Sequence, residues 1–474
     1  MRTVRVSTLI GKSTQSKLVA VVALCLVAAH LPVVAGESGV KNLWTRVRGE
    51  DWPQFLGPRR NGKSAERGIR TDWETKRPKI VWQQRLGEGY AIGSVAAGRL
   101  VQADRVGDKI RTRCWAAETG ELLWEYAYPT QYRDYYGYDG GPRCSPLIDG
   151  ERAYVYGPDG VLLCLHLSSG KLLWKCDTAK RFGVVQNFFG TGSTPVVYGD
   201  KLWVMVGGSP DEDQSLGPDR LDRVRGNGTA MVAFDKKTGR VLTKLSDELA
   251  SYSSPCIVQI DGRPWCFAYC RGGLLAFHPG TGAIDFHYPW RSRLLESVVV
   301  SSPVVVGRQV LITETYGPGS SLLQVRPGGY DVVWKDEKRS RQKILQGHMM
   351  TPVVHQGYVY ACSGRNPPVD LRCFEWKTGK LMWKLDNQYR TSLLYVDQHL
   401  VTLDETGMLR LIRVNPQRYA PVAEWDLGQP NALGSGQRLK GPCWAAPILA
   451  HGLLFVRGEG RIVCLELIPA EDAR

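Results

Sequence analysis

Polar and charged side chains stand at recurring points along this chain, in the short segments that separate its apolar runs. They include several carboxylates, several guanidinium groups and one imidazole. On converging loops, side chains of these types form binding sites, because they supply directional hydrogen bonds that an apolar wall cannot supply. The mixture suits an anionic ligand, a polyol or the ends of a peptide, and it defines no reaction, so no catalytic residue is assigned. The residues are Tyr138, Asp139, Arg143, Asn187, Glu248, Ser251, Arg271, Glu296, Glu314, Tyr316, His348, Arg365, Arg390, Glu405, Arg457 and Glu459.

One motif has the literal form of a phosphate-binding loop. Residues 57–64 read GPRRNGKS, which matches the pattern G-x4-G-K-S. That pattern holds phosphates only when a buried strand precedes it and a helix follows it. Here Pro58 lies inside the motif, and residues 65–73 have no helical periodicity. We therefore expect residues 36–78 to form an N-terminal strap packed on the main domain, with no nucleotide site.

A long segment rich in charge, residues 209–227, interrupts one of the repeats described below. Long loops in compact folds are often functional. Its Asp211, Glu212 and Asp213 could ligate calcium, but they lack the spaced ligands and the turn glycine of a calcium-binding loop. The segment favours a solvated lid, and the sequence predicts no metal site.

The chain has twelve cysteines, and one of them, Cys25, lies in the N-terminal segment. Most of the others fall inside predicted strands, where cysteine acts as a small apolar residue. No Cys-x2-Cys pair occurs, so we expect no structural zinc site. An odd number of the remaining cysteines leaves at least one thiol free, while Cys266 with Cys270 and Cys164 with Cys176 could form disulfides.

The elements that must position the polar residues are repeated. Eight times, a turn that usually contains glycine is followed a few residues later by a position that is usually aromatic. The copies are separated by roughly 40 to 70 residues, and a period in this range indicates a repeat architecture. Thr243 and Phe286 occupy two of these positions, and the other six are Trp82, Trp124, Trp174, Trp334, Trp383 and Trp425.

Most repeats contain the same succession of short strands. An apolar run opened by Ser-Pro or Thr-Pro comes first, as in CSPLI and STPVV, and a polar turn and an alternating strand such as KLWVMVG follow. A second turn, another strand and the aromatic phrase close the repeat. Short strands rich in Val, Tyr and Leu between Gly and Asp turns form antiparallel hairpins, and without a sustained 3.6-residue period few helices are expected. Four strands per repeat predict one blade of a β-propeller.

The two ends of the chain complete one another. Residues 445–467 supply three strands without a fourth, and residues 79–85 supply one strand without a repeat of its own. Pairing them closes the ring and removes open sheet edges. The sequence therefore predicts an all-β fold over residues 79–468, an eight-bladed propeller of four-stranded antiparallel blades closed by an N-terminal strand in the C-terminal blade, with a tail at 469–474. Loops between blades would bring the polar residues to a central funnel.

The phrases AFDKKTGRVLT and EWKTGKLMW resemble the tryptophan-docking motif of the PQQ-like, or quinoprotein-type, β-propeller family. The similarity covers roughly residues 79–468. The family includes quinoprotein alcohol dehydrogenases and the periplasmic BamB-like propellers. The resemblance implies that the six tryptophans pack against the turn of the next blade. The opening DWPQFLGPRRNG is similar to exported propellers of the planctomycete type.

Two functions are consistent with this resemblance. The first is a non-catalytic, BamB-like scaffold that binds a protein or a carbohydrate at the funnel face. The alternative is an alcohol dehydrogenase with pyrroloquinoline quinone (PQQ) over a calcium ion, for which Asn187 and Glu248 are the nearest matches to the calcium ligands. The vicinal Cys-Cys disulfide of those enzymes and a Cys-x2-Cys-His haem motif do not occur in this sequence. The sequence therefore favours the scaffold, without a cofactor.

Residues 1–35 have the features of a cleaved secretory signal. Four basic residues precede an apolar run at 18–29, and Ala35 ends a small-residue cleavage site. We expect a periplasmic or secreted protein with no membrane span after cleavage. The formal net charge is +15, but the cations are spread through all repeats. This distribution favours a solvated basic surface over nucleic acid binding.

Overall fold

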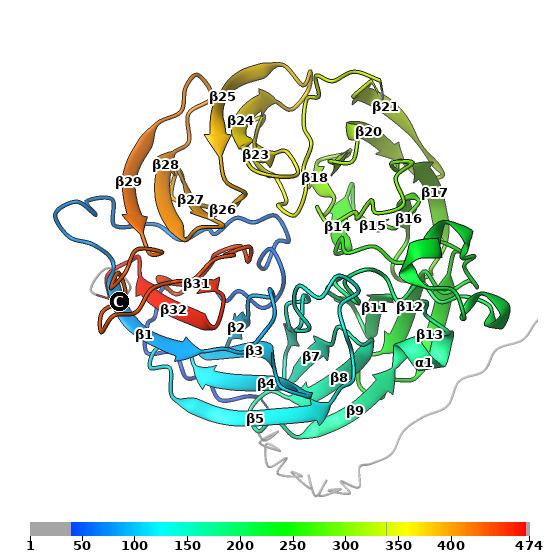
Figure 1. The fold of residues 1–474 in the computed structure, drawn as a ribbon, viewed down its shortest axis with the longest axis horizontal. Helices are drawn as coiled ribbons and strands as arrows, with labels where there is room; N and C mark the ends of the chain where they lie inside the picture. The colour runs from blue at the N-terminus through cyan, green and yellow to red at the C-terminus, as the bar shows by residue number, and fades with distance from the viewer. Residues whose placement is uncertain (1–38, 338, 471–474) are drawn as a thin grey trace, which may run out of the picture. The chain divides into compact units, whose positions relative to one another are not determined.

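The computed structural model describes residues 39–337 and 339–470. These residues form eight four-stranded antiparallel sheets around a central axis (Figure 1). The predicted eight-bladed propeller is confirmed. The predicted signal at 1–35 lies outside the described residues.

Within a blade, the chain runs from the innermost strand to the outermost. The first four complete blades are β2 (Ser94–Ala96), β3 (Arg99–Val106), β4 (Lys109–Ala116) and β5 (Leu122–Pro129); β6 (Leu147–Asp149), β7 (Arg152–Tyr156), β8 (Val161–His166) and β9 (Leu172–Asp177); β10 (Val196–Tyr198), β11 (Lys201–Met205), β12 (Met231–Asp235) and β13 (Val241–Leu245); and β14 (Cys256–Ile260), β15 (Arg263–Tyr269), β16 (Gly273–Phe277) and β17 (Ile284–Pro289).

The next three blades continue in the same order, and the last blade combines both ends of the chain. They are β18 (Val304–Val306), β19 (Gln309–Glu314), β20 (Gly319–Arg326) and β21 (Gly329–Lys335); β22 (Val353–His355), β23 (Tyr358–Ser363), β24 (Val369–Glu375) and β25 (Leu381–Gln388); β26 (Thr391–Val396), β27 (His399–Asp404), β28 (Met408–Arg413) and β29 (Pro421–Asp426); and β30 (Ile448–Ala450), β31 (Leu453–Gly458) and β32 (Arg461–Glu466) with β1 (Lys79–Arg85).

The ring is closed by strand pairing between the two ends of the propeller. Strand β1 pairs antiparallel with β32, with Trp82 opposite Cys464 and Gln84 opposite Ile462. The predicted closure is confirmed. Because β1 covers the outer edge of β32, the last blade has the same four strands as the others.

The sequence pattern of a strand follows its place in the blade. Middle strands such as β8 (VLLCLH) are buried on both faces, because each blade is packed between two others. Outer strands such as β9 (LLWKCD) alternate between exposed and more buried positions. All eleven described cysteines are buried free thiols, so neither Cys266 with Cys270 nor Cys164 with Cys176 forms a disulfide.

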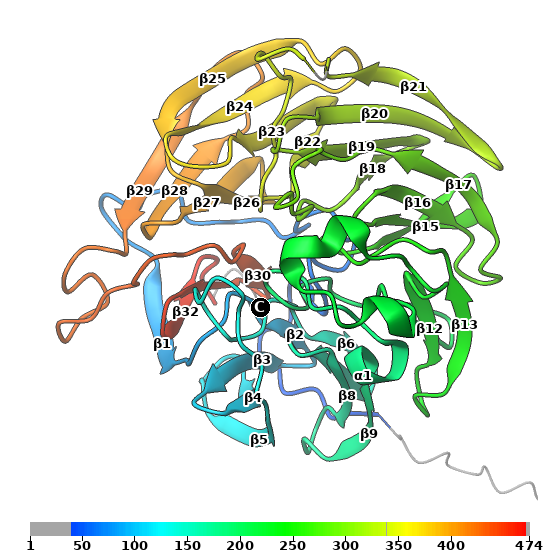
Figure 2. The same cartoon turned by 45° about the vertical axis from the view of Figure 1, so that its right-hand side comes forward.

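Helices are few in the described part of the chain, as predicted. There is one α-helix, α1 (Thr178–Phe182), whose first turn is capped by the Asp177 side chain. The 209–227 insertion contains two 3₁₀ turns, η1 (Asp211–Asp213) and η2 (Pro218–Arg223), drawn in green toward the viewer in Figure 2. None of the described helices has the length and apolar character needed to cross a membrane.

The recurrent tryptophans lie between neighbouring blades. Trp124 Nε1 donates to the Leu167 carbonyl at 2.8 Å, and its indole covers Gly170 so closely that a Cβ there would lie 2.6 Å from the ring. Trp82 covers Gly120 and Trp174 covers Gly239 in the same way. The glycine of the repeated phrase is thus required both by its positive φ and by the indole above it.

The remaining tryptophans of the set vary this arrangement. Trp334 and Trp383 keep the Nε1 hydrogen bond, at 2.9 Å in each case, to the carbonyls of Trp376 and Asn415 in the next blade. Trp425 faces the last blade, which has no glycine-containing phrase, and the guanidinium of Arg77 lies 5.8 Å from the centre of its ring.

Candidate functional site

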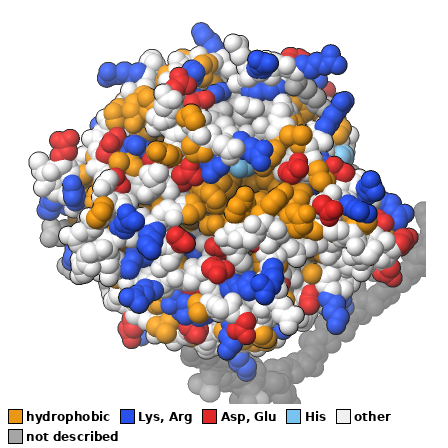
Figure 3. Space-filling view, viewed as in Figure 1, with side chains coloured by type: hydrophobic (Ala, Val, Ile, Leu, Met, Phe, Trp, Pro, Cys, Tyr) orange, Lys and Arg blue, Asp and Glu red, His pale blue; other side chains and the backbone are white. Residues whose placement is uncertain are grey.

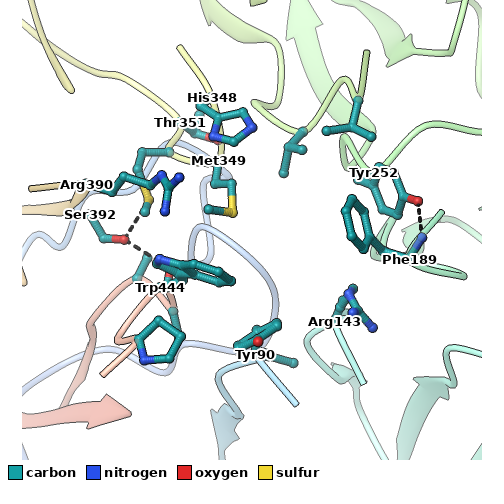
Figure 4. Close-up of a pocket in the computed structure, with 18 of the residues that line it drawn as sticks. Tyr90, Arg143, Phe189, Tyr252, His348, Met349, Thr351, Arg390, Ser392 and Trp444 are labelled. Carbon is teal, nitrogen blue, oxygen red and sulfur yellow. Dashed lines mark hydrogen bonds between the residues drawn. The ribbon is translucent and has the colours of Figure 1, made fainter. Parts of the chain in front are cut away.

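A cavity of about 720 Å³ lies on the propeller axis. Figure 3 shows hydrophobic side chains gathered around the centre of this face, beside basic side chains and a histidine. Figure 4 shows aromatic, basic and methionine side chains around the same space, contributed by different blades. This is the concave, largely apolar site with a few polar groups that small-ligand pockets have in common.

One position of each repeat forms a ring around this cavity. It lies two residues before the Ser, Thr or Ala that opens the innermost strand segment. Because the blades are related by rotation about the axis, equivalent positions converge on it. The eight residues, all in the cavity lining, are Ile92, Arg143, Gly192, Tyr252, Val300, Met349, Arg390 and Trp444. We call them the axial ring. Only Arg143 and Arg390 were chosen from the sequence, although the repeat alignment carried the signal for the other six.

The residues that open the innermost strands form a continuous hydroxyl belt. The amide of Ser145 donates to Thr194 Oγ1, that of Thr194 to Ser254 Oγ, that of Ser254 to Ser302 Oγ and that of Ser302 to Thr351 Oγ1, at 3.0–3.2 Å. The proline that follows each of these residues has no N–H to donate. The hydrogen bonds of the belt therefore come from the Ser and Thr amides, and they link five blades. The recurrent Ser-Pro and Thr-Pro therefore fix the loops that carry the axial ring.

The N-terminal strap lies at one end of this cavity, where Phe55 and Leu56 contribute to the lining. Figure 1 shows the blue strap entering the ring. Residues 57–64 form turns, with no helix, and Lys63 and Arg60 contact backbone carbonyls of β22 and β14. The phosphate-loop match thus lies in a segment that packs against β14 and β22.

Two guanidinium groups are held in the cavity wall. Arg143 donates to Asp134 Oδ2 at 3.0 Å and lies 5.7 Å from the ring centre of Tyr90. Arg390 pairs with Glu405 Oε2 at 2.9 Å. The same oxygen of Glu405 accepts from Trp444 Nε1 at 2.8 Å, so one carboxylate orients two cavity residues.

Arg365, exposed at the cavity mouth, lies 4.4 Å from the ring centre of Tyr316, and its guanidinium has no ion pair among residues 39–337 and 339–470. Glu296, also exposed at the mouth, likewise has no ion pair within that part of the chain. Tyr138 lines the mouth as well. These groups are free to exchange water for the hydroxyl or charged groups of a ligand.

His348 lines the cavity as a neutral imidazole. Burial, reinforced by the charges of Arg390 and Arg365, lowers its pKa to about 3. Its Nε2 lies 3.5 Å from the Tyr316 hydroxyl. At neutral pH this side chain is therefore a hydrogen-bonding group and carries no charge.

Three of the predicted funnel residues are tied into the protein outside the cavity lining. Asp139 accepts from the amides of Gly89 and Gly141. Glu248 accepts from the Gly272 amide and pairs with His287 at 2.8 Å. Glu314 is 1% exposed, accepts from Ser292 and Ser297, and has its pKa raised by burial to about 7. The carboxylate oxygens of these three residues thus accept hydrogen bonds from the protein itself.

Two further predicted residues, Asn187 and Arg271, line a separate cavity of about 200 Å³. Arg271 is buried and donates to Asp222 of the insertion at 3.1 Å. Asp222 also binds Arg291. Leu221 and Val224 of the insertion pack on Tyr252 and other apolar residues beside the central cavity. The insertion, predicted as a solvated lid, is thus anchored to the propeller through both charge pairs and apolar contacts.

The calcium and PQQ that the family resemblance implies can be tested against these side chains. Calcium prefers six to eight oxygen ligands, usually with several carboxylates. Asn187 and Glu248 do not line one common cavity, and the central cavity presents Arg143, Arg365 and Arg390 but only Glu296 as a lining carboxylate. This donor set does not fit calcium.

Comparisons with known proteins agree on the fold. A family model described as outer membrane protein assembly factor BamB matches residues 71–265 and 223–420. No curated protein sequence matches the chain.

Among solved structures, BamB from Moraxella catarrhalis is 15% identical, with 82% of this chain and 97% of that chain covered and a TM-score of 0.52. Quinohemoprotein alcohol dehydrogenase from Comamonas testosteroni is 11% identical, with 88% and 80% covered and a TM-score of 0.60. Saccharomyces cerevisiae Sqt1 is 10% identical, with 82% and 98% covered and a TM-score of 0.53.

These structural likenesses show the propeller fold alone, because proteins with different functions share it. The family match is more specific, since it spans most of the blades with their repeated phrase. The chain therefore belongs to the PQQ-like β-propeller repeat family of BamB.

Proposed function

We propose that this protein is an exported, non-catalytic β-propeller that binds a carbohydrate in its central cavity. The observation that carries the proposal is the combination of aromatic planes and free polar groups in one cavity of about 720 Å³. Trp444, Tyr90 and Phe189, which are all partly exposed, contribute the planes. Sugars present an apolar face to such planes and hydroxyl groups to the polar side chains around them.

The polar groups suit hydroxyls in their geometry. Arg365 offers a planar guanidinium, Glu296 offers a carboxylate, and Asn366 offers an amide, all in the cavity lining. Arg and carboxylate side chains can each hydrogen-bond two adjacent hydroxyl groups. Since Arg365 and Glu296 have opposite charge, the site accepts neutral sugars as well as acidic ones.

A protein partner, as in the outer membrane assembly role named for the matching family, is the competing scaffold function. A standard protein interface removes about 800 Å² from each partner and needs a broad surface. This face instead has a cavity of about 720 Å³ with exposed polar groups at its mouth, which supports a small or chain-like ligand.

The proposal is tested with the purified protein on an array of neutral, uronic-acid and sulfated oligosaccharides, followed by calorimetry on the strongest ligand. We expect Arg365→Ala to weaken binding at least tenfold, about 1.4 kcal/mol. The matched control is Arg326→Ala, which removes an exposed arginine from β20 on the outside of the ring. Absence of glycan binding, or equal affinity of Arg365→Ala and the wild type, would overturn the proposal.

Export is a separate part of the proposal, supported by the signal-like sequence of residues 1–35. Intact-mass measurement of the protein recovered from the periplasm or medium should give a chain that begins at Gly36. A full-length chain retained in the cytoplasm would contradict export without affecting the ligand proposal.

A further inference from the structure

The mouth of the central cavity carries stacked, exposed aromatic side chains. Tyr136 is 43% exposed and Tyr138 is 70% exposed. Their ring centres are 5.8 Å apart, and the rings are inclined by 28°. Phe188 stacks under Tyr136 at 5.7 Å, and Phe189 stacks on Tyr138 at 6.2 Å. We call Tyr136 and Tyr138 with these two supports the tyrosine platform.

The platform continues the cavity outward. Tyr136 and Tyr138 both line it, and Phe189 reaches from the platform to the wall beside Tyr252. Exposed aromatic groups of this size on a protein surface mark interaction sites. Stacking among the rings holds them in place, so little side-chain entropy is lost when a ligand covers them.

The opposite end of the cavity is closed by the strap. On one side, Trp52 exchanges two backbone hydrogen bonds with Val95 of β2, at 2.9 and 2.8 Å. On the other, the Ser64 amide donates to the Tyr395 carbonyl of β26, and the Tyr395 amide donates to Gly62. Between these attachments, Phe55 and Leu56 line the cavity, and Arg60 reaches the Ile257 carbonyl of β14 on the far side, so the strap is fixed across the ring.

A chain-like ligand consequently has one way in. It cannot thread through the axis, because the strap spans the ring. The volume of about 720 Å³ lies within the range of small-ligand pockets and is too small for a folded polymer. Only the end of a chain can fill the cavity while the rest leaves past the mouth.

We infer that the cavity recognises the end of a glycan chain, with the terminal sugar between Trp444 and Phe189 and the following sugars over the tyrosine platform. Trp444 and Phe189 both line the cavity, and Figure 4 shows them on opposite sides of the space. The inference rests on the proposed carbohydrate binding. It adds the part of the carbohydrate that is bound and the direction in which the chain leaves.

The first test uses a length series of the best oligosaccharide from the array, from one sugar to six, measured by calorimetry. Affinity should rise over the first few sugars and then become constant. Tyr136→Ala combined with Tyr138→Ala should remove this gain, at least tenfold for the longer ligands, and leave the monosaccharide affinity unchanged. The control Tyr389→Ala removes a tyrosine that is 51% exposed and outside the cavity lining. It should change neither the gain in affinity with ligand length nor the monosaccharide affinity.

The second test uses the same oligosaccharide blocked at one end, either reduced to the alditol or capped at the non-reducing terminus. One of the two blocks should weaken binding at least tenfold, and the other should have little effect. Equal binding of both blocked forms and the free oligosaccharide would overturn end recognition while leaving carbohydrate binding intact. If no glycan of any length binds, the proposed function itself fails.

Discussion

The amide of Ser254 donates to Oγ of Ser302 in the neighbouring blade at 3.1 Å. This bond is one member of the hydroxyl belt that holds successive inter-blade loops around the axis. Ser302 is 4% exposed, so removal of its hydroxyl group would leave the Ser254 amide buried without a hydrogen-bond partner.

The belt predicts a stability cost at Ser302. Ser302→Ala should lower the free energy of unfolding by about 1–3 kcal/mol, because the Ser254 amide stays buried and unpaired. Denaturant unfolding measures the change. Ser215→Ala, in the exposed part of the insertion, is the control and should have little effect. Equal stability of both variants would contradict a structural role of the belt.

The tryptophan contacts predict a paired effect across two blades. Trp124→Ala should cost about 3–5 kcal/mol of unfolding free energy, because a large buried side chain is removed. Gly170→Ala should also destabilise, because its φ is +68° and the new methyl group would meet the indole. Leu123→Ala, on the exposed side of the same strand, is the control for thermal and denaturant unfolding. A melting temperature unchanged in Trp124→Ala would rule out the docking role.

Glu405 is predicted to position cavity residues without touching the ligand. Glu405→Ala removes the acceptor shared by Arg390 and Trp444 and should weaken glycan binding about tenfold. Glu405→Gln keeps one acceptor oxygen and should restore part of the affinity. Calorimetry measures the glycan affinity of both variants under conditions in which each is fully folded. The control is Glu424→Ala, which removes the carboxylate of an exposed ion pair with Arg410. Failure of Glu405→Gln to bind better than Glu405→Ala would contradict the positioning role.

Glu314 predicts a pH dependence of stability. Burial raises its pKa from 4.5 to about 7, so the folded state holds the proton more tightly than the unfolded chain between these values. The free energy of unfolding that Glu314 contributes therefore falls as pH rises through this window, by about 3 kcal/mol. Glu314→Gln has no carboxyl group to titrate at this position. Its free energy of unfolding should therefore rise relative to that of the wild type by that amount as the pH increases from 4.5 to 7.

Denaturant unfolding at several pH values across the window measures the gap between the two proteins. The matched control is Glu296→Gln, which removes an exposed carboxyl group and is measured over the same pH series. A constant gap for Glu314→Gln would mean that the carboxyl group is already ionised at the acid end of the window.

The cavity charges predict a negative result with calcium and PQQ. Glu296 is the one carboxylate in the cavity lining, which supplies too few oxygen ligands for calcium, and the PQQ of the alternative function would lie over that ion. Equilibrium dialysis with both additives should give no stoichiometric retention, and alcohol should not drive dye reduction. Tight binding with turnover would replace the scaffold proposal with the dehydrogenase.

The propeller itself could be predicted because its information is local and repeated. The Gly-to-Trp phrase, the Ser-Pro openings and the alternating strands recur in most repeats, and the unmatched strand at residues 79–85 identifies the closure with the last blade. Hydrophobic pattern and turn chemistry act within a few residues, so one sequence suffices to read them.

The composition of the cavity was decided by tertiary structure. Arg143 and Arg390 face the axis, whereas Asp139, also on a loop, and Glu314, at the end of β19, accept hydrogen bonds from neighbouring backbone amides. A polar residue near the end of a strand or in a loop can point into the cavity or toward neighbouring backbone with little change in the local sequence. The choice depends on partners brought together only when the blades close into a ring, because long-range contacts, and not strand propensity, determine which donors and acceptors remain free.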